Sequence, residues 1–359
     1  MSKPHQIYLD SSPILSNQLI TSADLRCTFI DTVKTLLQQT NHTLIPCSAP
    51  NLNFQTFLNG LKTHPKVYQA CMSRQFAADL PPDIEQTALQ DEPKDWFIKT
   101  ADFGDTHDRV LQHRDGEYSK FLEDIARYHH IFQQTGCDRL VTFQPAEYSS
   151  YKPQVTAAMQ CLGYGSKQFY FIPVQPLKLY AFHTESNEIQ PISDLPLDEL
   201  QKAVNLETLR WYSLRVPFDQ TATLNISTSN PEHPENHFYR IQLTYAYTQK
   251  YLTLLQNLNF DSSDSASAVA AENSTEQKIE QTLDRTQTIC DRAIEEIAPH
   301  LICQHVEQIA EQTLNWLPSP QWQSSSYQTL QRIRDTLFDL VEVQLGFVLI
   351  PTANTTPAR

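Results

Sequence analysis

The stretch from residue 103 to residue 164 places two helical patterns around one short apolar run, and this order most constrains the fold. The three- and four-residue spacing from Leu122 to His129 predicts an amphipathic helix. The apolar run 140–143 predicts a buried strand, and Pro153 suits the first turn of a second helix. A turn, a helix, a strand and a helix in this order indicate one unit of a parallel α/β sheet.

The N-terminal stretch predicts a second unit of the same kind. Residues 7–13 indicate a strand that ends in a turn, and the apolar stripe from Leu25 to Leu37 indicates a helix that runs to about Thr40. Three residues between them are candidate helix N-caps: Thr21, Ser22 and Asp24. A strand, a polar loop and a capped helix are typical of a Rossmann-like sheet.

The remaining segments are less regular. Residues 45–100 are read as a divergent insertion, in which residues 58–72 suggest one or two helices, and 168–182 predicts strands with prolines at their ends or edges. Residues 261–276 are of low complexity and predict a flexible loop. Helices are expected on both sides of this loop as far as residue 350, and the tail 351–359 is polar.

Composition narrows the class of protein. The chain has 359 residues, of which 40% are hydrophobic and 19% charged, so it can form two globular domains. There is no apolar run of about 18 residues and no apparent secretory signal, so we expect a cytoplasmic protein without a membrane span. The seven cysteines show no C-x-x-C pair, which favours reduced, mostly buried thiols over a metal site. The net charge of −14 disfavours strong non-specific binding to RNA.

Several motifs give the chain a family resemblance. Residues 103–110 read F-G-D-T-H-D-R-V, and they are followed by D-G-E-Y, by D-I-A at 124–126 and by L-G-Y at 162–164. In this order and spacing, over about sixty residues, the chain resembles the second half of the catalytic domain of arginyl-tRNA synthetases. Residues 11–13 and 25–28 resemble the opening of that domain, and residues 205–212 and 236–247 resemble two motifs of its helical anticodon-binding region, often called the DALR domain.

The resemblance implies a fold and a domain order. It implies an α/β Rossmann-like class I aminoacyl-tRNA synthetase domain, here degenerate, at residues 1–200. An all-α anticodon-binding-type domain is expected at 201–350. The chain is expected to begin at the catalytic-type domain, without the additional N-terminal domain of the family.

The positions that carry the family's chemistry differ in this chain. The phosphate-binding H-x-G-H is replaced by Thr21-Ser22-Ala23-Asp24, and the adenosine-recognising W-G-A-D-H-H is replaced by residues 144–149, which include Pro145. Lys120 stands where the resemblance implies an arginine-binding tyrosine, and the stretch 179–194 holds no lysine of a K-M-S-K-type loop. An aspartate beside phosphate and a lysine beside a guanidinium are both electrostatically unfavourable. We therefore predict no catalytic residues, no cofactor and no metal site.

The best-matching residues form two candidate sets. The first set would line a cleft: Asp105, Arg109, Lys120, Asp124 and Tyr151. The second set would contact tRNA or another partner: Arg210, Tyr239, Gln242 and Tyr245. Structural explanations compete with these roles, because Asp124 can pair with Lys120 one helical turn earlier and Arg109 can belong to a structural salt bridge.

Three functions remain open at this point. The favoured one is a synthetase-like pseudoenzyme that has lost aminoacylation and binds tRNA or another RNA, in a regulatory role. A protein-interaction module on the same scaffold is the main alternative, because residues 277–350 carry five basic and ten acidic residues. The third is a residual arginine-tRNA ligase or another nucleotide-dependent enzyme.

Overall fold

The computed structural model describes residues 6–10, 30–39, 43–44, 52–70, 94–183, 188–192, 200, 202–230, 232–258, 275–318 and 324–349. The chain divides into two compact units. We call residues 5–14 and 42–173 the α/β unit, and we call residues 1–4, 15–41 and 174–359 the helical unit. The domain boundary near residue 200 remains a proposal, since the chain passes between the units more than once.

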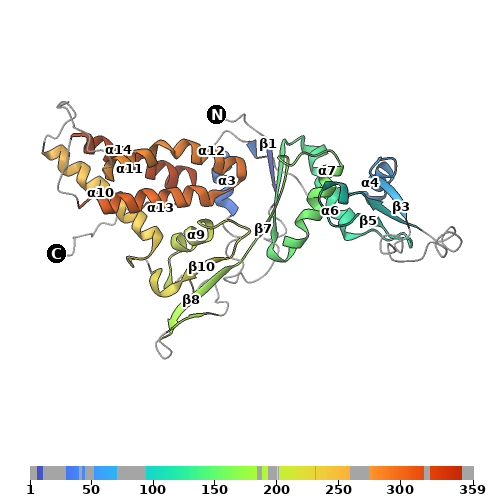
Figure 1. Cartoon of the computed structure of the whole chain (residues 1–359), viewed down its shortest axis with the longest axis horizontal. Coiled ribbons are helices and arrows are strands. Elements are labelled where there is room, and N and C mark those ends of the chain that lie inside the picture. Colours follow the sequence, from blue (N-terminus) through green and yellow to red (C-terminus); the bar gives the residue numbers. More distant parts are fainter. Residues whose placement is uncertain are drawn as a thin grey trace. The chain divides into compact units, whose positions relative to one another are not determined.

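The α/β unit contains the predicted parallel sheet (Figure 1). Its strands are β1 (Gln6–Asp10), β2 (Thr43–Leu44), β6 (Arg139–Pro145) and β7 (Phe169–Val174), in the order β2-β1-β6-β7. β1 runs parallel to both β2 and β6, which confirms the α/β class. In β6 the residues from Arg139 to Gln144 are all buried, as expected for a strand covered on both faces. β7 lies at the edge of the sheet, where Pro173 is tolerated.

Two predicted helices pack against this sheet. α6 (Lys120–Thr135) begins at Ser119, whose Oγ accepts a hydrogen bond from the Leu122 N–H. It ends at Gly136, which adopts the left-handed conformation that glycine allows. α7 (Lys152–Cys161) carries a proline in its first turn. The apolar faces of both helices meet the sheet in one core, which includes Leu122, Leu140 and Val155.

A small antiparallel sheet was not predicted from the sequence. It consists of β3 (Val67–Ala70), β4 (Asp95–Ile98) and β5 (Arg109–Gln112), in the order β3-β4-β5. The helix expected within residues 58–72 is present in α4 (Phe54–Leu61), but the expectation is wrong for residues 67–70, which form β3. A turn through Lys62–Lys66 ends the helix, and Val67 then pairs with Ile98. The short 3-10 helix η2 (Ala101–Phe103) lies between β4 and β5 along the chain, and a second, η3 (Ala146–Ser150), lies between β6 and α7.

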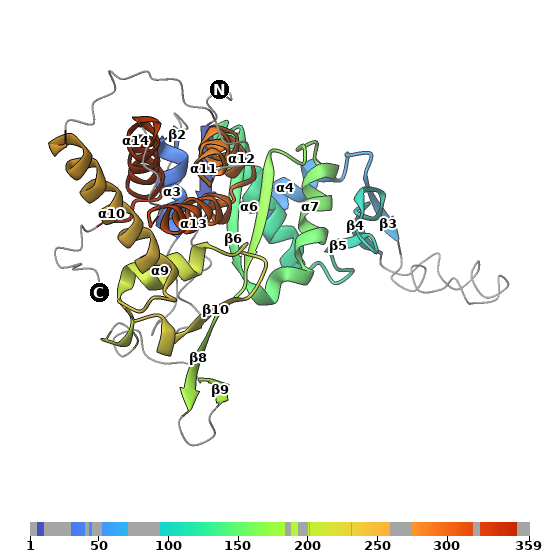
Figure 2. The ribbon, with the colours of Figure 1, turned by 60° about the vertical axis from the view of Figure 1, so that its left-hand side comes forward.

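The helical unit is dominated by long amphipathic helices, as predicted. They are α10 (His237–Asn257), α11 (Thr275–Asp284), α12 (Thr286–Glu296), α13 (Pro299–Trp316) and α14 (Ser324–Phe338), which continues as a π-helix, η5 (Asp339–Gln344). α13 packs against α10, α11 and α12, and α14 packs against α10 and α11 (Figures 1 and 2). Trp316 and Tyr327 are buried in this bundle.

Three further segments complete the helical unit. α3 (Ile30–Gln39) buries Val33, Leu36 and Leu37, and it packs against η5. α9 (Leu206–Leu214) begins at Asn205, whose side chain accepts a hydrogen bond from the Thr208 N–H. β8 (Leu177–His183) pairs in parallel with β10 (Ala222–Asn225) and antiparallel with β9 (Glu188–Pro191), and β10 leads into a short 3-10 helix, η4 (Ile226–Thr228).

A buried ion pair connects three helices of this unit. Glu307 of α13 accepts hydrogen bonds from Arg215 at 2.7 and 2.8 Å and from the Trp211 indole at 2.8 Å. His237, the first residue of α10, lies 3.1 Å from the same carboxylate. Burial would raise the pKa of Glu307, but the hydrogen bonds and charges of Arg215 and His237 outweigh it and lower the pKa to about 2.

Some sequence expectations fall outside the described residues. They concern Ser11–Pro13, Thr21–Asp24, residues 261–274 of the predicted loop and the tail 351–359. The last two residues of that predicted loop, 275 and 276, instead begin α11. Within the described part, the four cysteines Cys137, Cys161, Cys290 and Cys303 are buried free thiols, as expected. No described helix has the length and the apolar character that crossing a bilayer requires.

Candidate functional site

A cavity of about 240 Å³ lies at the carboxyl end of β6, beside the first turns of α6. In open parallel sheets, the carboxyl ends of the strands are the usual place for a ligand. Eight residues line the cavity: Lys120, Asp124, Arg127, Tyr128, Gln144, Tyr148, Tyr151 and Phe171. Three of the five residues predicted for a cleft are therefore brought together here, namely Lys120, Asp124 and Tyr151.

The carboxylate of Asp124 is at the centre of the cavity's polar contacts. Lys120 Nζ lies 3.2 Å from its Oδ1 atom, and the Tyr151 hydroxyl donates a hydrogen bond to Oδ2 at 3.1 Å. The structural explanation, an ion pair between Lys120 and Asp124 along the helix, is thus confirmed. The Asp124 side chain is only 14% exposed, whereas that of Lys120 is 76% exposed.

The electrostatics of the cavity keep the Lys120 amine and the Tyr151 phenol protonated. Burial would lower the pKa of Lys120, but the carboxylates of Asp124 and Glu123 outweigh it and raise the pKa. Burial, reinforced by the negative charge of Asp124, raises the pKa of Tyr151. At neutral pH Lys120 is therefore an ammonium group and Tyr151 is a protonated phenol, and both contact the Asp124 side chain.

Sequence reasoning missed Arg127 and Tyr128 of the cavity, and it noted Gln144 and Tyr148 only as part of the altered stretch 144–149. Tyr128 follows Asp124 by one helical turn and therefore shares its face of α6, a spacing that could have revealed it. The Gln144 amide donates to the Tyr128 hydroxyl at 3.2 Å and to Thr142 Oγ1 at 2.9 Å. Arg127 Nη2 donates to the same hydroxyl at 3.0 Å, and its guanidinium lies 4.9 Å from the Tyr128 ring centre. The lining thus holds two cations and one carboxylate.

Asp105 and Arg109 belong to the same unit but do not line the cavity. They form a two-pronged ion pair, with Arg109 Nε 2.6 Å from Oδ2 and Nη2 2.7 Å from Oδ1 of Asp105. Burial would raise the pKa of Asp105, but hydrogen bonds from Arg109 and the Thr106 N–H lower it overall. The pair spans the turn between η2 and β5, where Gly104 has a φ of +94°. This two-pronged ion pair therefore stabilises the turn.

The second predicted set lies in the helical unit, mostly inside it. Gln242 and Tyr245 of α10 are buried, and Tyr239 is partly buried on the same helix. Arg210 of α9 pairs with Glu207 at 3.0 Å and donates to the Gly346 carbonyl and to Thr32 Oγ1. Its guanidinium also lies 4.3 Å from the ring centre of Phe347. Arg210 therefore connects α3, α9 and the segment after η5.

No described group of three histidine, cysteine or acidic side chains is placed to hold a metal ion. The His129 ring contacts the Tyr164 hydroxyl at 2.9 Å. Burial, together with the neighbouring His130, lowers the pKa of His129.

Comparisons with known proteins agree on one family. No family model matches the chain. The chain is 28% identical over 229 residues to the arginine–tRNA ligase of Dechloromonas aromatica, which is 62% of this chain and 37% of that protein. It is also 28% identical over 222 residues to the arginine–tRNA ligase of Oceanobacillus iheyensis, covering 60% and 38% of the two chains. The chain thus spans less than two fifths of the length of these curated relatives.

Solved structures show the same fold. A Campylobacter jejuni protein provisionally named an arginyl-tRNA synthetase superposes with a TM-score of 0.66 over 97% of this chain and 94% of its own, at 13% identity. The arginyl-tRNA synthetase of Thermus thermophilus superposes with a TM-score of 0.53 over 83% of this chain and 57% of its own, also at 13% identity. The predicted fold class is thereby confirmed.

Proposed function

Since this chain is arginyl-tRNA synthetase-like in sequence and in fold, we propose that it binds RNA, with tRNA as the first candidate, and does not attach arginine to it. The scaffold would then serve as a binding or regulatory module.

The main support for this proposal is that the Asp124 side chain already has two partners inside the cavity. A substrate guanidinium needs a carboxylate partner, and the one carboxylate that lines the cavity already holds Lys120 Nζ at 3.2 Å and the Tyr151 hydroxyl at 3.1 Å. A guanidinium that entered would also meet the second cation, Arg127. Like charges in one small cavity repel, so the cavity disfavours arginine.

Sequence differences outside the cavity support the same conclusion. The sequence Thr21–Asp24 contains no histidine that could donate to a phosphate, and it contains an aspartate, which a phosphate would repel. Pro145 ends β6 without a backbone N–H. The residues that bind phosphate, adenosine and the guanidinium in the family are all replaced in this chain. Restoring one of these sites would therefore leave the other two altered.

Two measurements test the proposal directly. In the first, purified protein is incubated with ATP, tRNA and labelled arginine, and we expect no time-dependent charging. A bacterial arginyl-tRNA synthetase in the same buffer is the positive control. Steady charging above a no-enzyme blank would refute the loss of aminoacylation.

In the second measurement, filter binding with an arginine tRNA transcript at low salt should give a saturable curve. A curve that does not saturate, or one that a same-length polyanion reproduces, would refute the RNA-binding half of the proposal. The two halves can therefore fail separately.

The single variant Lys120→Tyr tests directly whether the pairing of Lys120 with Asp124 prevents arginine from binding. Because Lys120 is mostly exposed, its ion pair contributes at most about 1 kcal/mol to stability, and the variant should fold. Calorimetry with arginine should show no heat for the wild type and a weak binding signal for the variant. The exposed Lys278→Tyr serves as the matched control. Equal heat for wild type and variant would remove the proposed role of Lys120.

A further inference from the structure

A cavity of about 740 Å³ lies in the helical unit, between the C-terminal halves of α10 and α13. This volume is within the usual range of small-molecule sites, which are mostly apolar and hold a few polar groups. The two helices supply most of its lining side chains: Tyr247, Lys250, Tyr251 and Leu254 from α10, and Leu314 and Leu317 at the end of α13.

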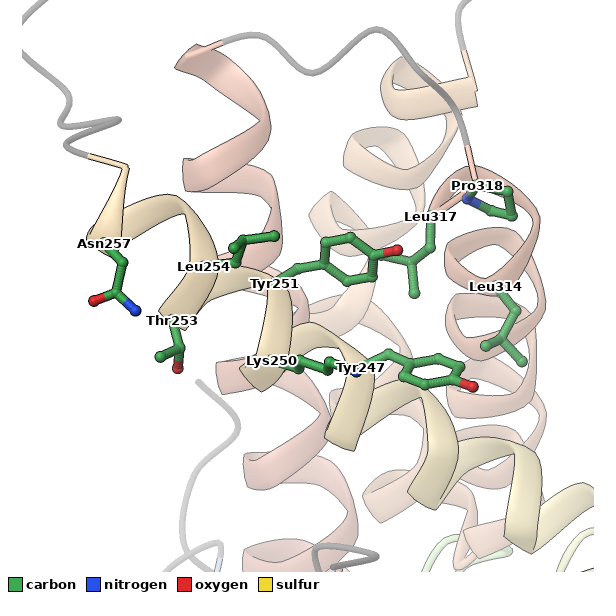
Figure 3. Close-up of a pocket in the computed structure, with 9 residues that line it drawn as sticks. All are labelled: Tyr247, Lys250, Tyr251, Thr253, Leu254, Asn257, Leu314, Leu317 and Pro318. Carbon is green, nitrogen blue, oxygen red and sulfur yellow. The ribbon is translucent and has the colours of Figure 1, made fainter. Parts of the chain in front are cut away.

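The surface of this cavity is mostly apolar. Tyr247, Tyr251 and Leu254 follow one another at spacings of four and three residues, so they share one face of α10. Figure 3 shows the two tyrosine rings extending from α10 toward Leu314 and Leu317. Leu254 is 50% exposed, although its side chain has no polar atom. An apolar molecule that filled the cavity would therefore remove leucine surface from water, which is favourable.

The charge of the cavity is unusual for this chain. The whole chain carries a net charge of −14, yet none of the nine lining residues is acidic. Lys250 follows Tyr247 by one helical turn, and Figure 3 shows its side chain on the same side of α10 as the two rings. Lys250 is exposed and makes no ion pair with any described residue. The cavity therefore offers a ligand one ammonium group and no carboxylate that would repel an anion.

We propose that this cavity binds an amphipathic organic acid, in which a single carboxylate is attached to an apolar body. The apolar body contacts the tyrosine rings and the leucine side chains, and the carboxylate pairs with Lys250. A cationic ligand finds no acidic partner among the lining residues. A polyanion needs several cations, whereas the lining residues supply one.

The apolar body can be an aliphatic chain or an aromatic ring, because both bury carbon atoms against leucine and tyrosine side chains. This site goes beyond the proposed RNA binding and does not rest on it. Its probes contain no nucleotide, so a failure to bind the acids and a failure to bind RNA are separate results.

Isothermal titration calorimetry of the full chain tests the proposal with octanoate and with 3-phenylpropanoate. At least one of the two acids should bind saturably at one site. The alcohol with the same carbon skeleton lacks the charge. It should therefore bind about fivefold more weakly, which is the most that an exposed ion pair usually contributes.

Lys250→Met tests the ion pair, because methionine keeps an apolar stem and removes the ammonium group. This variant should bind the acid about fivefold more weakly than the wild type and should bind the alcohol equally well. Lys278→Met, at an exposed position of α11, is the matched control and should change neither affinity.

Leu254→Asp tests the apolar wall. Leu254 is half-exposed, so the variant should fold. The aspartate should weaken binding of the acid by roughly tenfold or more, because it removes apolar contact and repels the ligand carboxylate. Leu258→Asp is the matched control, since Leu258 is 62% exposed at the end of the same helix and does not line the cavity. Circular dichroism of each variant verifies that the helices are intact.

Each outcome has a defined meaning. Tighter binding of octanoate assigns the site to aliphatic acids, and tighter binding of 3-phenylpropanoate assigns it to aromatic acids. Either result supports the proposal if Leu254→Asp loses binding and Leu258→Asp retains it.

Four results overturn the proposal. They are no binding of either acid, equal binding of the acid and its alcohol, unchanged binding of the acid by Lys250→Met, and equal loss of binding in the two leucine variants. Binding of a decapeptide composed of leucine and glutamate, with no binding of the acids, would assign the cavity to a protein partner and would also overturn the proposal.

Discussion

The carboxylate of Glu307 should make the stability of the helical unit depend on pH in a specific window. Its pKa in the folded protein is lowered to about 2, against about 4.5 for an ordinary glutamate. A folded pKa below the unfolded one means that the deprotonated form stabilises the fold. This contribution is complete above about pH 4.5, and it is lost as the pH falls toward about 2.

The magnitude follows from the size of that shift. Each pKa unit corresponds to about 1.4 kcal/mol, so a shift of this size contributes about 3 kcal/mol. The Glu307 side chain is only 16% exposed, so solvent screening reduces this value little. The physical source is the hydrogen bonds and positive charges of Arg215 and His237, which outweigh the effect of burial.

The assay is urea unfolding, followed by far-ultraviolet circular dichroism at several pH values between 2 and 7. Glu307→Gln keeps the shape and cannot titrate, so its free energy of unfolding should vary less with pH than that of the wild type. The difference between the two profiles should change by about 3 kcal/mol from pH 5 to pH 2. Subtracting the profiles removes the titration of all other carboxylates.

Glu311→Gln is the matched control, because Glu311 lies one turn further along α13 and is exposed. Its profile should follow that of the wild type. The reasoning is refuted if Glu307→Gln and Glu311→Gln show the same pH dependence. It is also refuted if the wild type loses none of this stability below pH 4.

Three further predictions concern stability and reactivity. Asn236→Ala should destabilise the protein by roughly 2 kcal/mol in urea unfolding, because this buried side chain caps α10 and also donates to Thr208 and to the Ser229 and Asn230 carbonyls; Asn257→Ala, at the exposed end of the helix, should have little effect. Arg210→Lys should lower the melting temperature measurably by calorimetry, since a lysine cannot reproduce the fork to Glu207 and Gly346 or the stacking on Phe347. Burial raises the pKa of Cys161 to about 12, so a thiol reagent at pH 8 should label it at the rate of unfolding, which urea accelerates.

Local patterns predicted the parallel part of the fold because each signal is contained in a few neighbouring residues. The spacing from Leu122 to His129, the apolar run of β6 and Pro153 at the start of α7 are each set by the period of one element. The three-stranded sheet β3-β4-β5 was missed for the opposite reason. Its strands are four residues long, and pairing of Val67 with Ile98 depends on contacts about thirty residues apart.

The contacts of the candidate cavity also divide into local ones, which the sequence predicts, and long-range ones, which it does not. The pairing of Lys120 with Asp124 follows from helix geometry alone, so it could be weighed from the sequence. The contact of Gln144 with Tyr128 joins a strand to a helix, and that of Glu307 with Arg215 joins residues 92 apart. Such partners are determined by packing, and neither residue type by itself indicates them.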